Sequence, residues 1–235
     1  METKYKRVLV KLSGEALSGS LGHGIEFETA TEVCRNIVKC LEYGAQIAIV
    51  CGAGNFWRGR QGSDMDPVKA DQMGMLATNM NAIALSELFR SVGAEAKVLS
   101  AVAMPQVCET YTKDLADKYL NEGKIVIFGG GTGCPFFTTD TAAALRAIEI
   151  GADIALMAKA VDGVYDKDPR TNPDAKKFDS ITYSEILDKK LGVIDLTAAS
   201  LCMEKNLPVL LFQLGKGESI AEALCGNNVG TVINV

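Results

Sequence analysis

The sequence predicts a three-layer α/β/α sandwich with a mainly parallel central sheet, built from one domain over residues 1–235. Three observations predict it. Short apolar runs typical of buried strands alternate with longer segments whose apolar residues recur at helical spacing. Glycines and other turn residues separate many of these segments. The 235 residues contain no internal repeat, linker or low-complexity tract, and this length is ordinary for a single α/β domain.

The composition is that of a folded, water-soluble protein, with 48% hydrophobic and 23% charged residues. The net charge of −5 argues against a nucleic-acid binder, although it still allows a local phosphate site. An apolar stretch of about 18 residues, which a membrane span requires, is missing, and so is a signal-peptide pattern. Seven cysteines without a Cys-x-x-Cys pair, and a single histidine, indicate reduced thiols in the cytoplasm and no metal site built from protein ligands.

Five elements are expected in the first hundred residues. The strands are short runs rich in Val, Ile, Leu or Ala, and the first helix has Val33, Ile37 and Leu41 at helical spacing before it stops at Gly44. In order they are a strand (7–12), a helix (27–43), a strand (46–51), a helix (70–92) and a strand (96–100).

The second half continues the alternation. Thr138, Thr139 and Asp140 are good capping residues for a helix, and Asp140 is interpreted as a structural cap. Residues 161–178 are rich in Gly, Asp, Pro and Asn, which predicts turns with a short hairpin. The elements are a helix (113–121), a strand (124–128), a helix (140–150), a strand (153–157), helices (184–189 and 198–206), a strand (209–212), a helix (219–224) and a strand (231–235).

Three predicted strands end in glycine-rich turns, at 11–15, 52–55 and 129–133. Ligands of open α/β sheets bind beyond the carboxyl ends of the strands, and glycine lets backbone N–H groups approach an anion. One such turn alone would be read as a tight connection, but three at one edge favour a phosphate-rich ligand. The P-loop and dinucleotide fingerprints are both missing from the sequence.

Lys11 is the notable charge at this edge, because it lies within an apolar strand. Its side chain either extends along the surface to water or points at the ligand. The adjoining Ser13-Gly14 favours the second interpretation.

Six segments resemble the UMP kinase branch of the amino-acid kinase family, in the same order and over essentially the whole chain. They are Lys11–Leu17, residues 54–59, Ala70–Thr78, Gly131–Asp140, Val161–Tyr165 with Asp168-Pro169, and Asp195–Ala198. The resemblance implies the amino-acid kinase fold and transfer of the γ-phosphoryl group of ATP to UMP in pyrimidine nucleotide biosynthesis. It also implies Mg²⁺ bound to the ATP phosphates.

The resemblance further implies a cytoplasmic homohexamer that UTP inhibits. The positions associated with GTP activation in some relatives are poorly matched between Ser86 and Lys124, which argues against activation by GTP. The acceptor phosphate of UMP is already anionic near pH 7, so this chemistry needs positioning and charge stabilisation rather than a general base.

The resemblance also implies residue roles. Lys11 would neutralise the transferred phosphoryl group and Asp195 would orient an active-site lysine, while Arg58 would contact the UMP phosphate and Asp71 the ribose. The ATP-binding residues implied are Lys11, Ser13, Gly14, Gly54, Arg58, Lys159, Tyr165 and Asp168. The UMP-binding residues implied are Gly52, Ala53, Arg58, Asp71, Thr132, Gly133, Cys134, Pro135, Phe136, Phe137, Thr138 and Thr139.

Three positions depart from the family pattern. Ala53 replaces the middle residue of a triple-glycine loop, and its methyl group narrows the approach of a phosphate. Cys134 stands where asparagine is usual, beside the expected uridine pocket. The loop that carries Lys159 is one residue shorter than usual, which weakens the assignment of Lys159 as a phosphate ligand.

Two other functions fit parts of the sequence. One is a sister kinase acting on a carboxylate or carbamate, against which Arg58 and Asp71 argue because they suit a nucleotide phosphate and ribose. The other is a non-catalytic nucleotide-binding oligomer, against which the retention of Lys11 and Asp195 argues.

Overall fold

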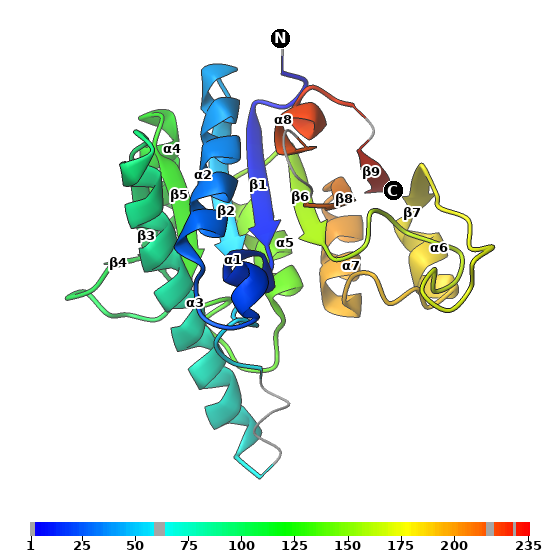
Figure 1. The fold of residues 1–235 in the computed structure, drawn as a ribbon, viewed down its shortest axis with the longest axis horizontal. Coiled ribbons are helices and arrows are strands. Elements are labelled where there is room, and N and C mark those ends of the chain that lie inside the picture. Colours follow the sequence, from blue (N-terminus) through cyan, green and yellow to red (C-terminus); the bar gives the residue numbers. More distant parts are fainter. Residues whose placement is uncertain (1–2, 59–63, 215–218, 228) are drawn as a thin grey trace.

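The computed structural model of the chain describes residues 3–58, 64–214, 219–227 and 229–235. Within these ranges, nine strands form one sheet in the order β4-β3-β5-β2-β1-β6-β8-β9-β7 (Figure 1). The strands are β1 (Arg7–Leu12), β2 (Gln46–Cys51), β3 (Ala96–Ser100), β4 (Glu109–Thr110), β5 (Ile125–Gly129), β6 (Ile154–Lys159), β7 (Ser180–Thr182), β8 (Val209–Gln213) and β9 (Gly230–Asn234). Neighbouring strands are parallel except for β8 and β9, which are antiparallel.

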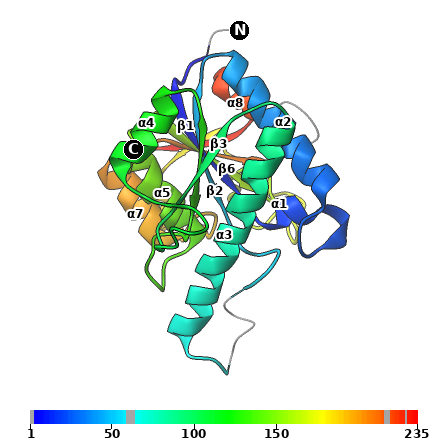
Figure 2. The same ribbon diagram turned by 90° about the vertical axis from the view of Figure 1, so that its left-hand side faces the viewer.

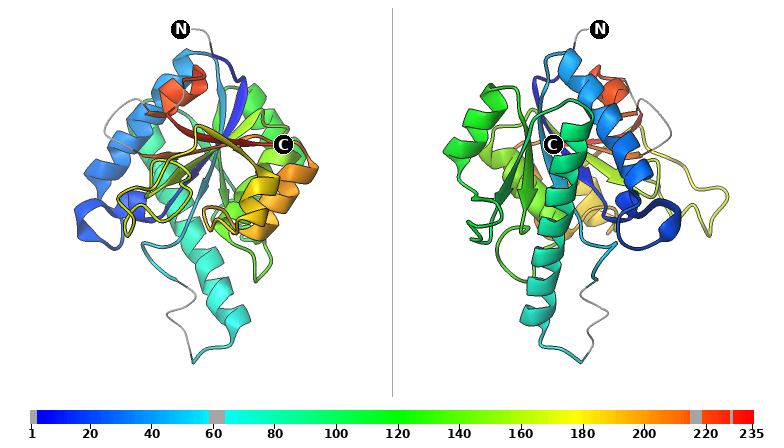
Figure 3. Two further views of the ribbon diagram at one scale, coloured as in Figure 1. Left: turned by 90° about the vertical axis from the view of Figure 1, so that its right-hand side faces the viewer. Right: turned by 60° about the vertical axis from the view of Figure 1, so that its left-hand side comes forward.

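Helices cover both faces of the sheet, which confirms the predicted sandwich (Figure 3, left). Helices α2, α3 and α8 pack on one face, and α4, α5, α6 and α7 on the other. The helices are α1 (Glu15–Ser18), the 3-10 turn η1 (Gly19–Leu21), α2 (Phe27–Glu42), α3 (Pro67–Ser91), α4 (Lys113–Asn121), α5 (Thr139–Glu149), α6 (Tyr183–Asp188), α7 (Leu196–Glu204) and α8 (Ser219–Leu224).

The alternation of side chains along β1 determines where Lys11 points. Successive residues of a strand face opposite sides of the sheet. Val8, Val10 and Leu12 pack with α2, α3 and α8, whereas Leu9 packs with α4 to α7. Lys11 shares the parity of Leu9, so its side chain faces α5. The same counting places Lys159 on this face, because Ala155 and Met157 of β6 belong to it.

Helix α3 is the longest helix in the part of the chain that the structure describes, and its N-terminal half extends past the edge formed by the carboxyl ends of the strands (Figure 2). It begins at Pro67, three residues before the predicted start at 70. Asp66 caps it by accepting hydrogen bonds from the backbone N–H groups of Val68 and Lys69 (2.9 and 3.2 Å). An Asp followed by Pro is a common start of a helix. The helix therefore begins at this pair, and not at residue 70, where the apolar pattern predicted its start.

The predicted strands and helices are confirmed, with ends that match or differ by at most three residues, whereas the shortest elements were missed. The missed elements are α1, η1, β4 and β7, each of four residues or fewer. The hairpin predicted within 161–178 is present as an antiparallel bridge between Tyr165 and Lys177. Among the described residues, no helix combines the length and apolar character needed to cross a bilayer. Gly59, the last residue of the 54–59 motif, lies outside the described ranges.

Candidate active site

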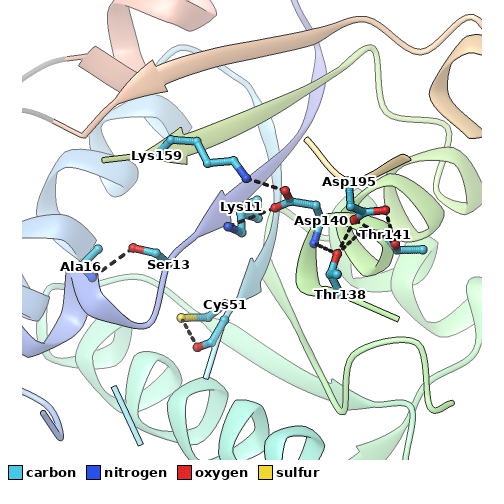
Figure 4. Close-up of polar contacts among 10 residues, drawn as sticks. Lys11, Ser13, Ala16, Cys51, Thr138, Asp140, Thr141, Lys159 and Asp195 are labelled. Atoms are coloured by element: carbon cyan, nitrogen blue, oxygen red, sulfur yellow. Dashed lines mark hydrogen bonds and ion pairs between the residues drawn. The ribbon is translucent and has the colours of Figure 1, made fainter. Parts of the chain in front are cut away.

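Two lysines from neighbouring strands meet one aspartate at the carboxyl edge of the sheet (Figure 4). Lys11 Nζ lies 3.1 Å from Asp140 Oδ1, and Lys159 Nζ donates to Asp140 Oδ2. Asp140 belongs to α5, which covers the face of the sheet that both lysines face. Lys11 and Asp140 are 7% and 8% exposed, so the group is held in a largely dry environment.

The charges of this group shift the pKa values of Asp140 and Lys159. Burial opposes ionisation of Asp140, but Lys11 and Lys159 prevail and hold the pKa of its carboxyl below the usual value. Burial lowers the pKa of Lys159, and Lys11 adds to the shift while Asp140 opposes it. The three residues therefore form a cluster with one excess positive charge, suited to receive an anion.

The sequence interpretation of Asp140 as a helix cap is wrong. Thr138 is the cap of α5, because its hydroxyl accepts from the N–H groups of Asp140 and Thr141 (3.1 and 3.2 Å). Asp140 is the second residue of the helix, and its side chain turns to the strands instead. Asp and Thr are both favoured at helix starts, so residue type alone could not separate these roles.

Asp195 occupies a neighbouring position with different partners. It caps α7 by accepting from the N–H group of Ala198 (2.9 Å) and also accepts from the hydroxyls of Thr138 and Thr141. Among the described residues, no lysine forms an ion pair with Asp195. The carboxylate that directly holds the lysines is Asp140, and Asp195 instead joins α7 to the start of α5.

The first two glycine-rich turns pack directly against each other. A Cβ atom added to Gly14 would lie 2.8 Å from both the carbonyl oxygen of Gly52 and the amide nitrogen of Gly54. Beneath them Asn55 and Asn81 pair through their side-chain amides, and Asn81 Nδ2 also donates to the carbonyl oxygen of Gly52 (2.8 Å). This contact fixes the ends of β1 and β2 relative to α3.

The third glycine-rich turn is also tied to α3. The hydroxyl of Thr78 accepts from the N–H group of Gly130 (2.8 Å), and Asp71 Oδ2 accepts from that of Phe136 (2.7 Å). Phe136 has a φ of 71°, which makes the loop turn sharply there. Phe136 and Phe137 are exposed, at the end of the loop.

The residues expected to line the uridine pocket lie together in the loop after β5. Thr132 and Cys134 bond within the loop, where the Thr132 hydroxyl donates to the Cys134 carbonyl (3.1 Å). Beneath it the buried Arg146 donates to the carbonyl oxygen of Gly131 (3.4 Å) and stacks on the ring of Tyr111. The remaining loop residues predicted here are Gly133, Pro135, Thr138 and Thr139.

Two clefts meet at Lys159. One, of about 710 Å³, is lined by Ser13, Glu15 and Ala160, among others. The other, of about 540 Å³, is lined by Tyr165 and Asp168, the residues expected near the adenosine portion of ATP. In it, the Tyr165 hydroxyl donates to Asp162 (2.8 Å).

Arg58 and Ala53 lie at the turn after β2. Arg58 forms an ion pair with Glu15, the first residue of α1. The carbonyl oxygen of Ala53 accepts from the N–H groups of Phe56 and Trp57 (both 2.9 Å), which closes the turn that positions Arg58. The sequence reasoning missed Glu15, Asn81 and Thr141 as parts of the site. A polar residue within an apolar helical pattern, such as Asn81, is a feature of the sequence from which such a residue could have been predicted.

Residues 6–213 match the sequence model described as "Amino acid kinase family", and the chain belongs to that family. Within it, the resemblance to UMP kinases is confirmed. The chain is 50% identical over 232 residues to "Uridylate kinase" of Deinococcus radiodurans, covering 97% of this chain and 95% of that protein. The crystal structure of UMP kinase from Bacillus anthracis superposes with a TM-score of 0.95 at 36% identity, covering 98% of this chain and 96% of that one. The UMP kinase of Ureaplasma parvum gives 0.93 at 36% identity, with coverage of 99% and 100%.

Proposed function

We propose that the protein transfers the γ-phosphoryl group of ATP to the phosphate of UMP, giving UDP and ADP in pyrimidine nucleotide biosynthesis. The observation that carries the proposal is the convergence of Lys11 and Lys159 on Asp140, at the carboxyl edge of the sheet, in a chain 50% identical to a uridylate kinase. The cytoplasm is the compartment that fits this role.

The transfer needs no general base. A phosphate oxygen of UMP attacks the γ-phosphorus while the bond from that phosphorus to the bridging oxygen of ADP breaks, and the electron pair leaves with ADP. Negative charge shifts to the bridging and peripheral oxygens as this happens. In this proposal Lys11 and Lys159 would stabilise that charge, and Asp140 would keep the two ammonium groups side by side in the absence of ligand.

The donor enters as the MgATP complex. Among the described residues, no group of three or more His, Cys, Asp or Glu side chains could enclose a metal ion. Asp140 and Asp195 are also engaged, one by two lysines and the other by two hydroxyls and a helix N-terminus. Mg²⁺ therefore fits as part of the substrate, held by phosphate oxygens and water, rather than in a preformed protein cage.

The donor and acceptor are assigned to opposite sides of the lysines. On the donor side, Ser13, Gly14, Gly54 and Lys159 would contact the ATP phosphates, with the adenosine portion near Tyr165 and Asp168. On the acceptor side, Arg58, Gly52 and Ala53 would hold the UMP phosphate. Asp71 and the 132–139 loop would hold the nucleoside, a role supported by the contact between Asp71 and Phe136.

We also propose a homohexamer inhibited by UTP and not activated by GTP. Exposed apolar residues on α3 support self-association, because Met73, Leu76 and Met80 are 39%, 51% and 51% exposed. These side chains recur on one side of the helix that extends beyond the sheet.

An acceptor panel tests the proposed function. Purified protein with saturating MgATP is offered UMP, CMP, dTMP and AMP, each with and without GTP, and products are separated by ion-exchange chromatography. We expect UDP from UMP, with little product from the other nucleotides and no stimulation by GTP. Failure to form UDP would exclude the proposal, and turnover of glutamate, aspartate or carbamate instead would favour the sister-kinase function.

A further inference from the structure

Arg58, the arginine assigned to the acceptor phosphate, is paired with a carboxylate of its own chain. Glu15 Oε1 accepts from Arg58 Nη2. Glu15 is the first residue of α1 and directly follows the Ser13-Gly14 turn. It also lines the 710 Å³ cleft together with Lys159.

The Glu15 carboxylate lies beside the glycine turn where a substrate anion is expected. A Cβ atom added to Gly54 would be 3.2 Å from Glu15 Oε1 and 3.8 Å from Arg58 Nε. A carboxylate oxygen and a guanidinium group therefore already meet next to Gly54. A phosphate oxygen bound to Arg58 at this turn, which also carries Gly52 and Ala53, would take the place that the Glu15 oxygen occupies.

The carboxylates of Asp140 and Glu15 both pair with positively charged side chains of the site, but they differ in how easily a ligand can displace them. Asp140 is buried, belongs to the 11-residue helix α5 and holds two lysines at once. The Glu15 side chain is 51% exposed and that of Arg58 is 39% exposed. An ion pair this exposed is worth little because water replaces each partner at small cost.

We propose that Glu15 is a displaceable internal anion: it holds the phosphate position on Arg58 in the ligand-free enzyme and gives way when the acceptor phosphate binds. The inference rests on the proposed function, since it takes a nucleoside monophosphate as the acceptor. Arg58 is thereby kept oriented without a ligand, and every acceptor must compete with Glu15 for it. The affinity for the acceptor is therefore lower than it would be if Glu15 did not compete for Arg58.

The substitution Glu15→Gln tests this competition, because it removes the charge and keeps the size of the side chain. Binding of UMP is measured by isothermal titration calorimetry without ATP, and the KM for UMP at saturating MgATP. We expect UMP to bind about two- to fivefold tighter to the variant, the range that follows from losing an exposed ion pair on the competing side.

Glu28→Gln is the matched control. Glu28 lines the same cleft and is exposed, whereas the carboxylate that pairs with Arg58 in the described part of the chain is that of Glu15. Its loss changes the net charge equally, so we expect unchanged UMP affinity. Equal tightening in both variants would show a general charge effect and overturn the proposal.

A second comparison uses Arg58→Ala. In the Arg58→Ala variant, the further substitution Glu15→Gln should leave the UMP affinity unchanged, because the guanidinium group for which Glu15 and UMP compete has been removed. Weaker or unchanged UMP binding by Glu15→Gln alone would mean that Glu15 only supports Arg58, and would overturn the proposal. If the unsubstituted protein binds no UMP, the proposed function itself fails, which is a distinguishable result.

Discussion

At the level of single side chains, Asp140 forms ion pairs with both lysines of the candidate site. Two ammonium groups brought this close would repel each other in a dry environment, and the shared carboxylate offsets that repulsion. When an anionic ligand binds, it can take over part of this neutralising role. The position of Lys11 could be predicted from the sequence, because a lysine in an apolar strand beside Ser13-Gly14 is unusual. The role of Asp140 could not, because its contact with β1 is made across 129 residues of chain.

Removing the Lys11 ammonium group should abolish most of the activity. We expect Lys11→Ala to lower kcat by about 10²- to 10³-fold, since a buried cation aimed at developing charge contributes on that scale. Steady-state assays at saturating UMP and MgATP measure it. Lys118→Ala, an exposed lysine of α4, serves as the control and should retain full turnover. Near-normal turnover in the Lys11 variant would refute its assigned role.

The shifted pKa of Lys159 predicts the alkaline limit of the reaction. Burial lowers this pKa below 10.5, so the side chain loses its charge at a lower pH than a free lysine. We therefore expect kcat/KM for MgATP to fall as pH rises, with an apparent pKa below 10.5. Lys159→Arg, which stays charged, should move this limb to higher pH. If the pH dependence of kcat/KM were identical in the variant, the loss of activity at high pH would have to come from the titration of another group.

At the scale of elements, prediction succeeded where a pattern extends over five or more residues. The buried strands β1, β2, β5, β6 and β8 are mainly apolar runs, which are typical of parallel strands covered on both faces. β4 and β7 have two and three residues, and depend on pairing with a neighbour rather than on their own sequence. The packing of one glycine turn on another could not be predicted either, because it depends on strand order.

Helix α3 holds the turns after β2 and β5 through the buried polar residues Asn81 and Thr78. Asn81 is fully buried, and its amide donates to Gly52 and to Asn55. We expect Asn81→Ala to lower the free energy of unfolding by about 1–3 kcal/mol, because buried acceptors lose their donor. It should also raise the KM for UMP by loosening the turn. Thermal unfolding at fixed protein concentration and steady-state kinetics measure the two effects.

Asn79→Ala is the control on the same helix. Asn79 is also buried, but its Oδ1 has no hydrogen-bond partner in the described part of the chain, and its amide makes one long contact with Met75 (3.3 Å). Its loss should cost less stability than that of Asn81. The opposite ranking would show that the Asn81 contacts do not hold the turn.

At the scale of the whole molecule, the exposed apolar residues of α3 should govern assembly. Met73, Leu76 and Met80 lie three and four positions apart and so share one side of the helix. We expect Leu76→Asp to reduce the molar mass in solution, measured by light scattering after size exclusion, because a buried unpaired charge is costly at an interface. Lys118→Asp on α4 should leave the mass unchanged. An unaltered mass in the Leu76 variant would place the contact elsewhere.

The overall architecture was the most predictable level. One sheet takes strands from Arg7 to Asn234, and the single domain over 1–235 stays a prediction. The alternation of strands and helices requires crossovers that leave helices on both faces. The antiparallel β9 was not anticipated as such, because its direction depends on the chain returning after α8 rather than on its composition.

Because successive side chains of β1 face opposite sides of the sheet, insertions within this strand would change which side Lys11 faces. Lys11 reaches Asp140 only because an even number of positions separates it from Leu9. Insertion of a single residue between them would turn the amine towards α2, whereas insertion of two would return it to the face of α5 but about 7 Å further along the strand, away from Asp140. Length changes should therefore be tolerated in the connections at the opposite end of the sheet, but not between Leu9 and Lys11.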